Sequence, residues 1–328
     1  MRTIFLFLFF SFADSQDACS SPLHWSGTRN ITIPVPLSAN NSNNATINRT
    51  FELFVPFQGH GLCGVQEWCT GPPNVTSPLV INWHGCNPHM PVVDYHTVIS
   101  KVRESAADYG YFAIHPVGTS LDPSLPDSQW GWNADGIPCG KPGVDDFLFF
   151  EALLDFAERE LCVNMRRVYT VGFSTGAFLS YGIACRYPDR IAAAGTNAGG
   201  LSRSYAEECA AGVGAVPMQS FHSLADPTVP YNGTAAWVGQ DDMNALWRQR
   251  NGCAADDVAG NTTFESDTTL CQRWDCPGAP VEACQLKDID HCWYGGRSGG
   301  FDSCVPRTGD VDATARMFQF WEELHAAN

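Results

Sequence analysis

A Gly-x-Ser-x-Gly motif at residues 172–176 could place a nucleophilic serine on a sharp turn. The motif follows a β-rich apolar run at 168–171 and precedes a helical pattern at 175–186. A turn this tight between a strand and a helix strains the backbone of its central residue, and side chains at the flanking glycines would collide across it. We therefore predict that Ser174 projects its hydroxyl over a helix N-terminus, whose amides favour developing negative charge. The alternative is a glycine-flanked turn that carries an inert serine.

A serine nucleophile needs a general base, and the base needs an acid to orient it. In folds with this strand-to-helix turn, the three groups follow in the order serine, acid, histidine. Asp226 is the best candidate acid because it lies just past an apolar strand pattern at 216–221, where the sites of open α/β sheets gather. Its alternative role is that of a turn-forming residue before Pro227.

His291, in a loop after the last predicted strand, is the best candidate base. His222 is its main rival, but we expect His222 to pack beneath the loop that carries Asp226. Asp290 is the neighbour of His291 in sequence, and adjacent side chains rarely face each other well enough for one to orient the other. Four further histidines precede the serine and so do not fit the order: His84, His89, His96 and His115.

Two backbone amides are needed to stabilise the oxyanion of an ester or amide reaction. The residue after the nucleophile, Thr175, supplies one. The loop after an early strand should supply the other, and Cys86 is the candidate because Gly85 lets the backbone approach a substrate closely. A zinc site built on His84, Cys86 and His89 is the competing interpretation, although no second ligand cluster has suitable spacing.

The elements that must position these residues alternate between β-rich runs and helical patterns. This alternation predicts an α/β fold with a largely parallel sheet flanked by helices. The segments 120–143 and 253–310 read as long loops of the kind that carry binding sites. The predicted strands are 51–56, 79–83, 111–115, 167–172, 216–221 and 281–286, and the predicted helices are 145–161, 175–186, 235–251 and 313–326.

Composition points to an oxidising compartment and excludes several classes of partner. The 328-residue chain has 14 dispersed cysteines, which we interpret as up to seven disulfides. Its formal net charge of −16 argues against binding to nucleic acid or to an anionic membrane surface. The basic residue Arg2, the apolar run 3–12 and the small residues at 13–15 are typical of a signal peptide.

We therefore predict a secreted, extracellular protein with three parts: a signal peptide at 1–15, a glycosylated N-terminal segment at 16–50 and a catalytic domain at 51–328. The polar stretch at 30–50 reads as a solvated loop that contains several glycosylation sequons. The chain has seven candidate sites: Asn30, Asn40, Asn44, Asn48, Asn74, Asn232 and Asn261.

Several short motifs occur together and in order: His84-Gly85-Cys86, Trp132-Asn133, Val144-Asp145-Asp146, the turn at 172–176, the segment 226–230 and His291-Cys292-Trp293. Over roughly residues 51–324, this ensemble resembles the polyhydroxybutyrate depolymerase / feruloyl esterase family of secreted α/β-hydrolases, including the type C feruloyl esterases. The resemblance implies a triad of Ser174, Asp226 and His291. It also implies an oxyanion hole at the Cys86 and Thr175 amides and a disulfide between Cys162 and Cys185.

The chain departs from the family pattern beside the acid and the base. Ser223 stands where the family often has glycine, and Ile289-Asp290 precede the base where Gly-Gly is usual. The negative charge of Asp290 could shift the pKa of the base. The extra cysteines between 253 and 304 suggest a remodelled lid.

The expected reaction is hydrolysis of carboxylic esters without metal or organic cofactor, by a protein that we expect to be monomeric. Among substrates we favour hydroxycinnamoyl esters of plant cell-wall polysaccharide. Trp130, Trp132 and Trp293 are the candidates for an aromatic binding wall, with burial in the core as the alternative. Polyhydroxyalkanoate or acetyl-xylan esters are the second choice of substrate. A catalytically inactive binding protein on a hydrolase scaffold is the alternative of another class.

Overall fold

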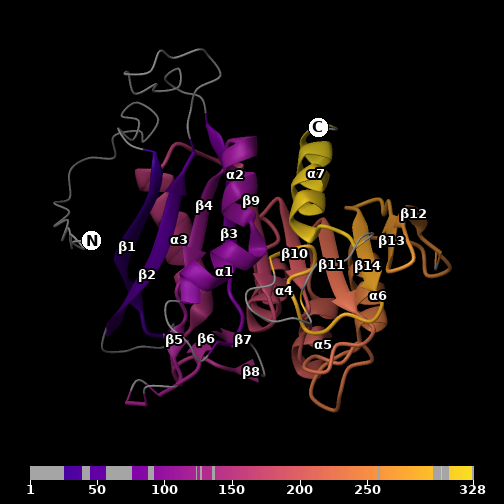
Figure 1. The fold of residues 1–328 in the computed structure, drawn as a ribbon, viewed down its shortest axis with the longest axis horizontal. Coiled ribbons are helices and arrows are strands. Elements are labelled where there is room, and N and C mark those ends of the chain that lie inside the picture. The colour runs from indigo at the N-terminus through magenta and orange to yellow at the C-terminus, as the bar shows by residue number, and fades with distance from the viewer. Residues whose placement is uncertain are drawn as a thin grey trace.

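A ten-stranded sheet forms the centre of the protein, in the order β1-β2-β4-β3-β9-β10-β11-β14-β13-β12 (Figure 1). The computed structural model describes residues 26–38, 45–56, 76–87, 92–122, 124–125, 128–134, 137–257, 259–297, 304 and 310–326. In this order, the six neighbouring strands from β4 to β14 run parallel to one another. Two further strands extend the sheet at each edge through antiparallel pairing. The strands of this sheet are β1 (Gly27–Pro36), β2 (Thr46–Val55), β3 (Ser77–Trp83), β4 (Phe112–Pro116), β9 (Val163–Phe173), β10 (Ala193–Asn197), β11 (Met218–Ser223), β12 (Asn261–Glu265), β13 (Thr269–Trp274) and β14 (Val281–Leu286).

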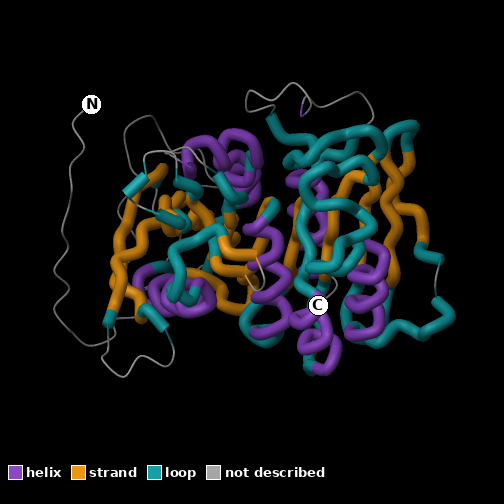
Figure 2. Tube along the Cα trace, turned by 90° about the horizontal axis from the view of Figure 1, so that it is seen from below, coloured by secondary structure: helices purple, strands orange, loops and turns teal. Residues whose placement is uncertain are grey.

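Helices cover both faces of the sheet, as the view along the strands shows (Figure 2). Side chains of β3 alternate between two cores: Leu79 and Ile81 belong to one hydrophobic cluster and Val80 to the other. This period of two is what a strand buried on both faces requires. The helices are α1 (Val92–Ser100), α2 (Val102–Tyr109), α3 (Asp146–Glu160), α4 (Thr175–Arg186), α5 (Arg203–Ala211), α6 (Gln240–Arg250) and α7 (Ala313–Ala326). In the described residues, no helix combines the length and the apolarity needed to cross a bilayer.

The expectation of a solvated loop over 30–50 is wrong for its described part. There β1 pairs with β2 along its whole length, from Gly27 opposite Val55 to Pro36 opposite Thr46. The reason is that Val35 is buried and Ile31 and Ile33 pack against the core, in an alternation that the polar neighbours obscure. The described sequon residues Asn30, Asn48, Asn232 and Asn261 are exposed, whereas Asn40, Asn44, Asn74 and the predicted signal peptide lie outside the described residues.

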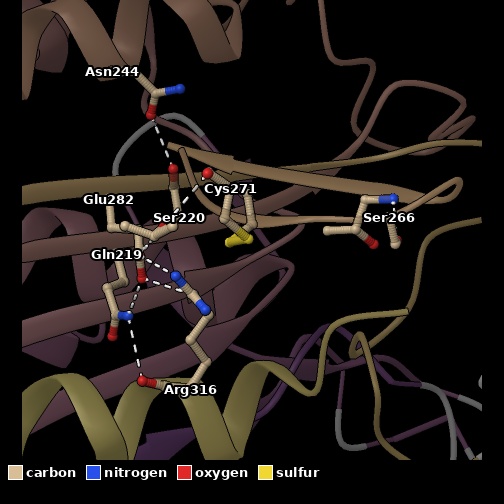
Figure 3. Close-up of a disulfide and its surroundings, with 10 residues drawn as sticks. Gln219, Ser220, Asn244, Ser266, Cys271, Glu282 and Arg316 are labelled. Atoms are coloured by element: carbon tan, nitrogen blue, oxygen red, sulfur yellow. Dashed lines mark hydrogen bonds and ion pairs between the residues drawn. A yellow bond between two sulfur atoms is a disulfide. The ribbon is translucent and has the colours of Figure 1, made fainter. Parts of the chain in front are cut away.

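The segment 253–310 also contains more regular structure than its sequence indicated. Strands β12 and β13 extend the sheet beyond β14, and a disulfide joins Cys271 to Cys284, which are directly opposite each other on β13 and β14. Beside it the buried Glu282 accepts hydrogen bonds from Gln219 of β11 and from Arg316 of α7 (Figure 3). These bonds anchor α7 to this end of the sheet. In its described residues, the segment around 120–143 forms the short strands β5 (Thr119–Ser120), β6 (Trp130–Gly131), β7 (Asn133–Ala134) and β8 (Ile137–Pro138).

The predicted pairing of Cys162 with Cys185 is wrong. Cys185 is bonded to Cys209, and Cys162 is bonded to another residue. The cause is the packing of α4, whose end lies against α5, where Cys209 is. Cys162 instead precedes β9 beside the start of β3, where its carbonyl accepts a hydrogen bond from Ser77. The other described disulfides are Cys86–Cys139, Cys253–Cys276, Cys271–Cys284 and Cys292–Cys304.

Candidate active site

Ser174 lies at the turn between β9 and α4, with φ 54° and ψ −122°. A non-glycine residue adopts a positive φ only when the surrounding structure enforces it. The turn is tight enough that both flanking residues must be glycines: a Cβ at Gly172 would lie 2.1 Å from the Gly176 carbonyl oxygen, and one at Gly176 would lie 2.2 Å from the Trp83 carbonyl oxygen. The Ser174 amide also donates to the Asn197 carbonyl at the end of β10. The serine is therefore held at the end of the parallel strands.

Asp226 follows β11, at the same carboxyl end of the parallel strands as Ser174, and its carboxylate is fully buried. Its Oδ1 accepts hydrogen bonds from the backbone amides of Thr228 and Val229, at 2.9 and 2.8 Å. Burial alone would raise the pKa of this carboxyl group. The hydrogen bond and charge of His291 and the Val229 amide outweigh burial, so that the pKa of Asp226 is lowered. The group therefore stays ionised in the folded protein.

His291 contacts this carboxylate directly. Its Nδ1 lies 2.8 Å from Oδ2 of Asp226, and its side chain remains 15% exposed. Because an ionised carboxylate only accepts, Nδ1 carries the proton and Nε2 of the neutral ring is free to take one. Asp290, next to His291 in the chain, points to solvent and is exposed. Asp226 is thus the residue that orients the imidazole.

His222 packs beneath the acid loop, which is the segment after β11 that carries Asp226. Its Nε2 lies 2.8 Å from the Val229 carbonyl oxygen and 3.5 Å from Oδ2 of Asp226. Burial lowers the pKa of His222, against smaller opposing effects of the Val229 carbonyl and the Asp226 charge. A neutral ring that is almost fully buried is poorly placed to reach a substrate.

A hydrogen bond joins Asp226 to His291, and the side chain of Phe173, the residue before Ser174, contacts the His291 ring. No hydrogen bond joins the Ser174 hydroxyl to His291 within the described part of the chain. Instead the ring of Phe173, the residue before the serine, lies against the imidazole with centroids 4.9 Å apart. Hydrogen bonds between nucleophile and base are often long without substrate and tighten in the complex.

The loop after β3 also lies close to the serine. A Cβ at Gly85 would lie 3.1 Å from Cβ of Ser174, so only a glycine fits without displacement. The Cys86 amide follows this glycine. Thr175 is the first residue of α4, and the amides of a helix's first turn have no partner within the helix. Both amides therefore lie on segments that flank the serine, as an oxyanion hole requires.

His84 fixes the conformation of this loop. Its Nε2 accepts a hydrogen bond from the Gly118 amide at 2.9 Å, so Nδ1 carries the proton and donates to the Gly85 carbonyl at 2.6 Å. Burial lowers the pKa of His84 to about 4, against a smaller rise caused by the Gly85 hydrogen bond. The His84 carbonyl accepts from the indole of Trp132. His84 is therefore committed to backbone contacts.

The bond between Cys86 and Cys139 removes the thiolate that the alternative zinc site would use. His89, the third residue of that alternative, lies outside the described residues. The disulfide also ties the loop of Cys86 to the segment that contains β6 and β7. In the residues that the structure describes, no cluster of histidine, cysteine and carboxylate side chains could hold a metal ion.

Two of the three tryptophans predicted to line the site are buried in the core, so an aromatic wall made of all three is wrong. Trp132 is fully buried against Trp83 and His84. Trp293 is 3% exposed, and its indole donates to Thr314 of α7. Trp130 is half-buried, and its backbone pairs with Asn87, next to Cys86. Of these three tryptophans, Trp130 is the one whose side chain is partly exposed.

The comparison with known proteins starts from sequence. No protein-family model matches the chain. The probable feruloyl esterase C of Aspergillus terreus is 27% identical over 116 residues, which is 35% of this chain and 39% of that protein. Feruloyl esterase B of Piromyces equi is 26% identical over 236 residues, which is 68% of this chain and 41% of the relative. The chain is similar to the feruloyl esterases. It spans about two fifths of the length of these feruloyl esterase relatives.

Solved structures confirm the predicted fold class. The acetyl xylan esterase from Aspergillus awamori has a TM-score of 0.58 at 13% identity, covering 90% of this feruloyl esterase-like chain and 99% of that chain. MGS-M1, an α/β hydrolase from a deep-sea metagenome library, has a TM-score of 0.53 at 14% identity, covering 92% and 99%. At these identities the likeness concerns the fold. The chain has the α/β-hydrolase fold.

Sequence reasoning missed the residues that join the acid loop to the base loop, which is the segment after β14 that carries His291. The Ser223 hydroxyl donates to the Ile289 carbonyl, and the Tyr294 hydroxyl accepts from the Ser223 amide. Ser223 stood out only as a departure from glycine. For Tyr294, which is fully buried, the sequence carried no signal beyond its closeness to His291.

Proposed function

We propose that this chain is a serine carboxylic-ester hydrolase with Ser174, Asp226 and His291 as its triad. The observation that carries the proposal is the 2.8 Å contact between Nδ1 of His291 and Oδ2 of Asp226. It lies at the carboxyl ends of the parallel strands, where Ser174 has a positive φ. The similarity to feruloyl esterases supports the reaction class. A protein that acted only by binding would have no chemical use for a carboxylate buried against a partly exposed imidazole.

In the proposed mechanism, Nε2 of His291 takes the proton of the Ser174 hydroxyl as its oxygen attacks the ester carbonyl. Asp226 holds the imidazole in the required tautomer and stabilises the imidazolium. The Cys86 and Thr175 amides stabilise the oxyanion of the tetrahedral intermediate. The imidazolium then protonates the departing alcohol, and an acyl group remains on Ser174. Water, activated by the same histidine, releases the acid and restores the serine.

For the substrate, we propose hydroxycinnamoyl esters such as those of plant cell-wall polysaccharide. The similarity to proteins named feruloyl esterases supports the acyl group. Trp130 supports it as well, because its backbone pairs with Asn87 beside the candidate oxyanion loop and its side chain is partly exposed, and a tryptophan ring stacks well on a flat aromatic acyl group. A net charge of −16 fits a neutral polysaccharide better than an acidic one.

Secretion and glycosylation complete the proposal. The five disulfides among the described residues support an oxidising compartment. The exposure of Asn30, Asn48, Asn232 and Asn261 supports their use as glycan sites. A shift in mass after enzymatic removal of N-glycans would test this part.

The reaction class is tested with a fluorophosphonate, which phosphonylates activated serines irrespective of the acyl specificity. Peptide mapping should find the label on Ser174, and Ser174→Ala should abolish labelling. Labelling of another residue, or none, would reject the triad. Methyl ferulate, acetylated xylan and 3-hydroxybutyrate oligomers should then be compared by kcat/KM. A preference for either of the last two would reject the proposed acyl group and keep the reaction class.

A further inference from the structure

Phe173 occupies the space between the candidate base and the candidate oxyanion loop. It is the last residue of β9, half-buried, directly before Ser174. Its ring plane is inclined by 33° to that of His291, with centroids 4.9 Å apart. On the other side, a Cβ at Gly85 would lie 3.0 Å from Cδ1 of the ring. The Phe173 ring, which belongs to the residue next to Ser174, therefore contacts both His291 and the loop of Gly85.

The face of an aromatic ring carries partial negative charge and attracts a cation within about 6 Å of its centroid. In the proposed reaction, His291 is uncharged before attack and is an imidazolium when the tetrahedral intermediate forms. At a centroid distance of 4.9 Å, the charged ring lies within this range of the Phe173 π system. An aliphatic side chain of similar volume would fill the space without this electrostatic effect.

The other titratable groups near the imidazole either favour its protonated form or are uncharged. The buried Asp226 favours its protonated form, and the exposed Asp290 adds a more screened negative charge. His222 contacts the same Asp226 carboxylate, and burial keeps His222 neutral. The Tyr294 hydroxyl is also neutral, because burial raises its pKa well above the ordinary value. Phe173 thus adds an attraction toward the imidazolium that none of these groups supplies.

We propose that Phe173 is a positioning residue that holds the His291 ring toward Ser174 and stabilises its protonated form during acyl transfer. The proposal rests on the proposed function, in which His291 is the base. It separates two contributions of the ring: a steric one, which an aliphatic residue could retain, and an electrostatic one, which only another aromatic residue could retain.

The experiment compares Phe173→Leu with Phe173→Tyr. For the leucine variant we expect kcat on p-nitrophenyl acetate to fall about three- to tenfold, with KM changed less than about twofold, and the acid limb of the kcat/KM profile to move to lower pH by about half a unit. Phe173→Tyr should keep both values near wild type. Phe264→Leu is the matched control, because Phe264 is also a partly buried ring packed on the core, but on the edge strand β12. It should change neither value.

A second measurement does not depend on turnover. In the Ser174→Ala background, the NMR titration midpoint of His291, assigned with His291→Gln, should be lower with Phe173→Leu and unchanged with Phe173→Tyr. An unchanged midpoint and kcat in the leucine variant would overturn the proposal, as would equal losses in both variants. If the leucine variant were too unstable to study, Phe173→Met would replace it with the same expectations. Failure of fluorophosphonate labelling in the wild type would reject the proposed function instead.

Discussion

The hydroxyl of Ser223 donates a 2.5 Å hydrogen bond to the carbonyl of Ile289, two residues before His291. The Ser223 amide donates to the Tyr294 hydroxyl, three residues after His291. One fully buried residue at the end of β11 therefore contacts the base loop on both sides of the imidazole. Asp226 lies only three residues further along, so these two bonds fix the distance between acid and base.

We predict that Ser223→Ala lowers kcat about three- to thirtyfold and destabilises the protein by about 1–2 kcal/mol. The loss of stability is that of a buried hydrogen bond whose acceptor is left without a partner. The loss of kcat follows because the Asp226–His291 contact is no longer held from the Ile289 side, whereas KM should change little. Kinetics and thermal unfolding measure the two effects. Ser204→Ala, at an exposed serine on α5, is the control and should be neutral. An unchanged kcat in the Ser223→Ala variant would contradict the prediction.

The assignment of the base predicts opposite outcomes for two histidines. His291→Ala should lower kcat by about three or more orders of magnitude, as removal of a triad member does elsewhere. His222→Ala should keep most of the activity but lower the melting temperature, because it leaves a cavity and an unpartnered Val229 carbonyl. Steady-state kinetics and calorimetry on both variants distinguish the roles. If the two results were exchanged, His222 would be the base.

The elements predicted best are those with strong apolar periodicity. The predicted bounds of β14, α4 and α7 agree with the structure, and each of the three buries apolar side chains in the hydrophobic core. The missed strands lack such a signal. β12 and the exposed face of β1 are polar because they lie at the sheet's edges, and β10 consists of small residues that pack where α7 approaches closely.

The site shows the same limit. Chain order and strand ends were enough to single out Asp226 and His291, which the structure joins by a hydrogen bond. They could not indicate that Trp132 and Trp293 point into the core, because a tryptophan beside a site motif has the same sequence environment whether it binds substrate or packs. Nor could spacing indicate that Cys185 pairs with Cys209, since that pairing depends on how α4 meets α5.

Three buried histidines predict a loss of stability in mild acid. Burial lowers the pKa of His84 to about 4 and that of His115 to about 3, and that of His96 well below its ordinary value. The unfolded chain binds protons near pH 6.5, so these groups stabilise the fold fully above that pH. Their contribution is lost as pH falls from 6.5 toward the folded pKa values, at up to about 1.4 kcal/mol per pH unit for each residue.

We therefore expect the melting temperature to fall steeply between pH 6.5 and 4.5, as measured by circular dichroism in buffers of constant ionic strength. His325, exposed near the end of α7, provides the control: His325→Gln should leave the slope unchanged. A melting temperature that stayed constant over this range would show that the buried histidines do not govern acid stability.

The disulfide between Cys86 and Cys139 should matter for turnover as well as for stability. It closes a loop with a sequence separation of 53 residues, for which the chain-entropy model gives about 4 kcal/mol. It also holds the residue whose amide is the second proposed oxyanion donor. Replacing both cysteines by alanine should therefore lower kcat by about tenfold or more, with a smaller change in KM, at temperatures where the variant remains folded.

The matched control is the disulfide between Cys253 and Cys276, whose sequence separation is 23 residues. It lies near Asn251, which bonds to Val216 before the start of β11, whereas Asp226 follows the other end of this strand. Its double alanine variant should lose about 3 kcal/mol of stability and keep the wild-type kcat. Equal effects of the two variants on kcat would mean that the Cys86–Cys139 bond acts only through global stability, because a local effect on the oxyanion loop requires the bond to be at that loop.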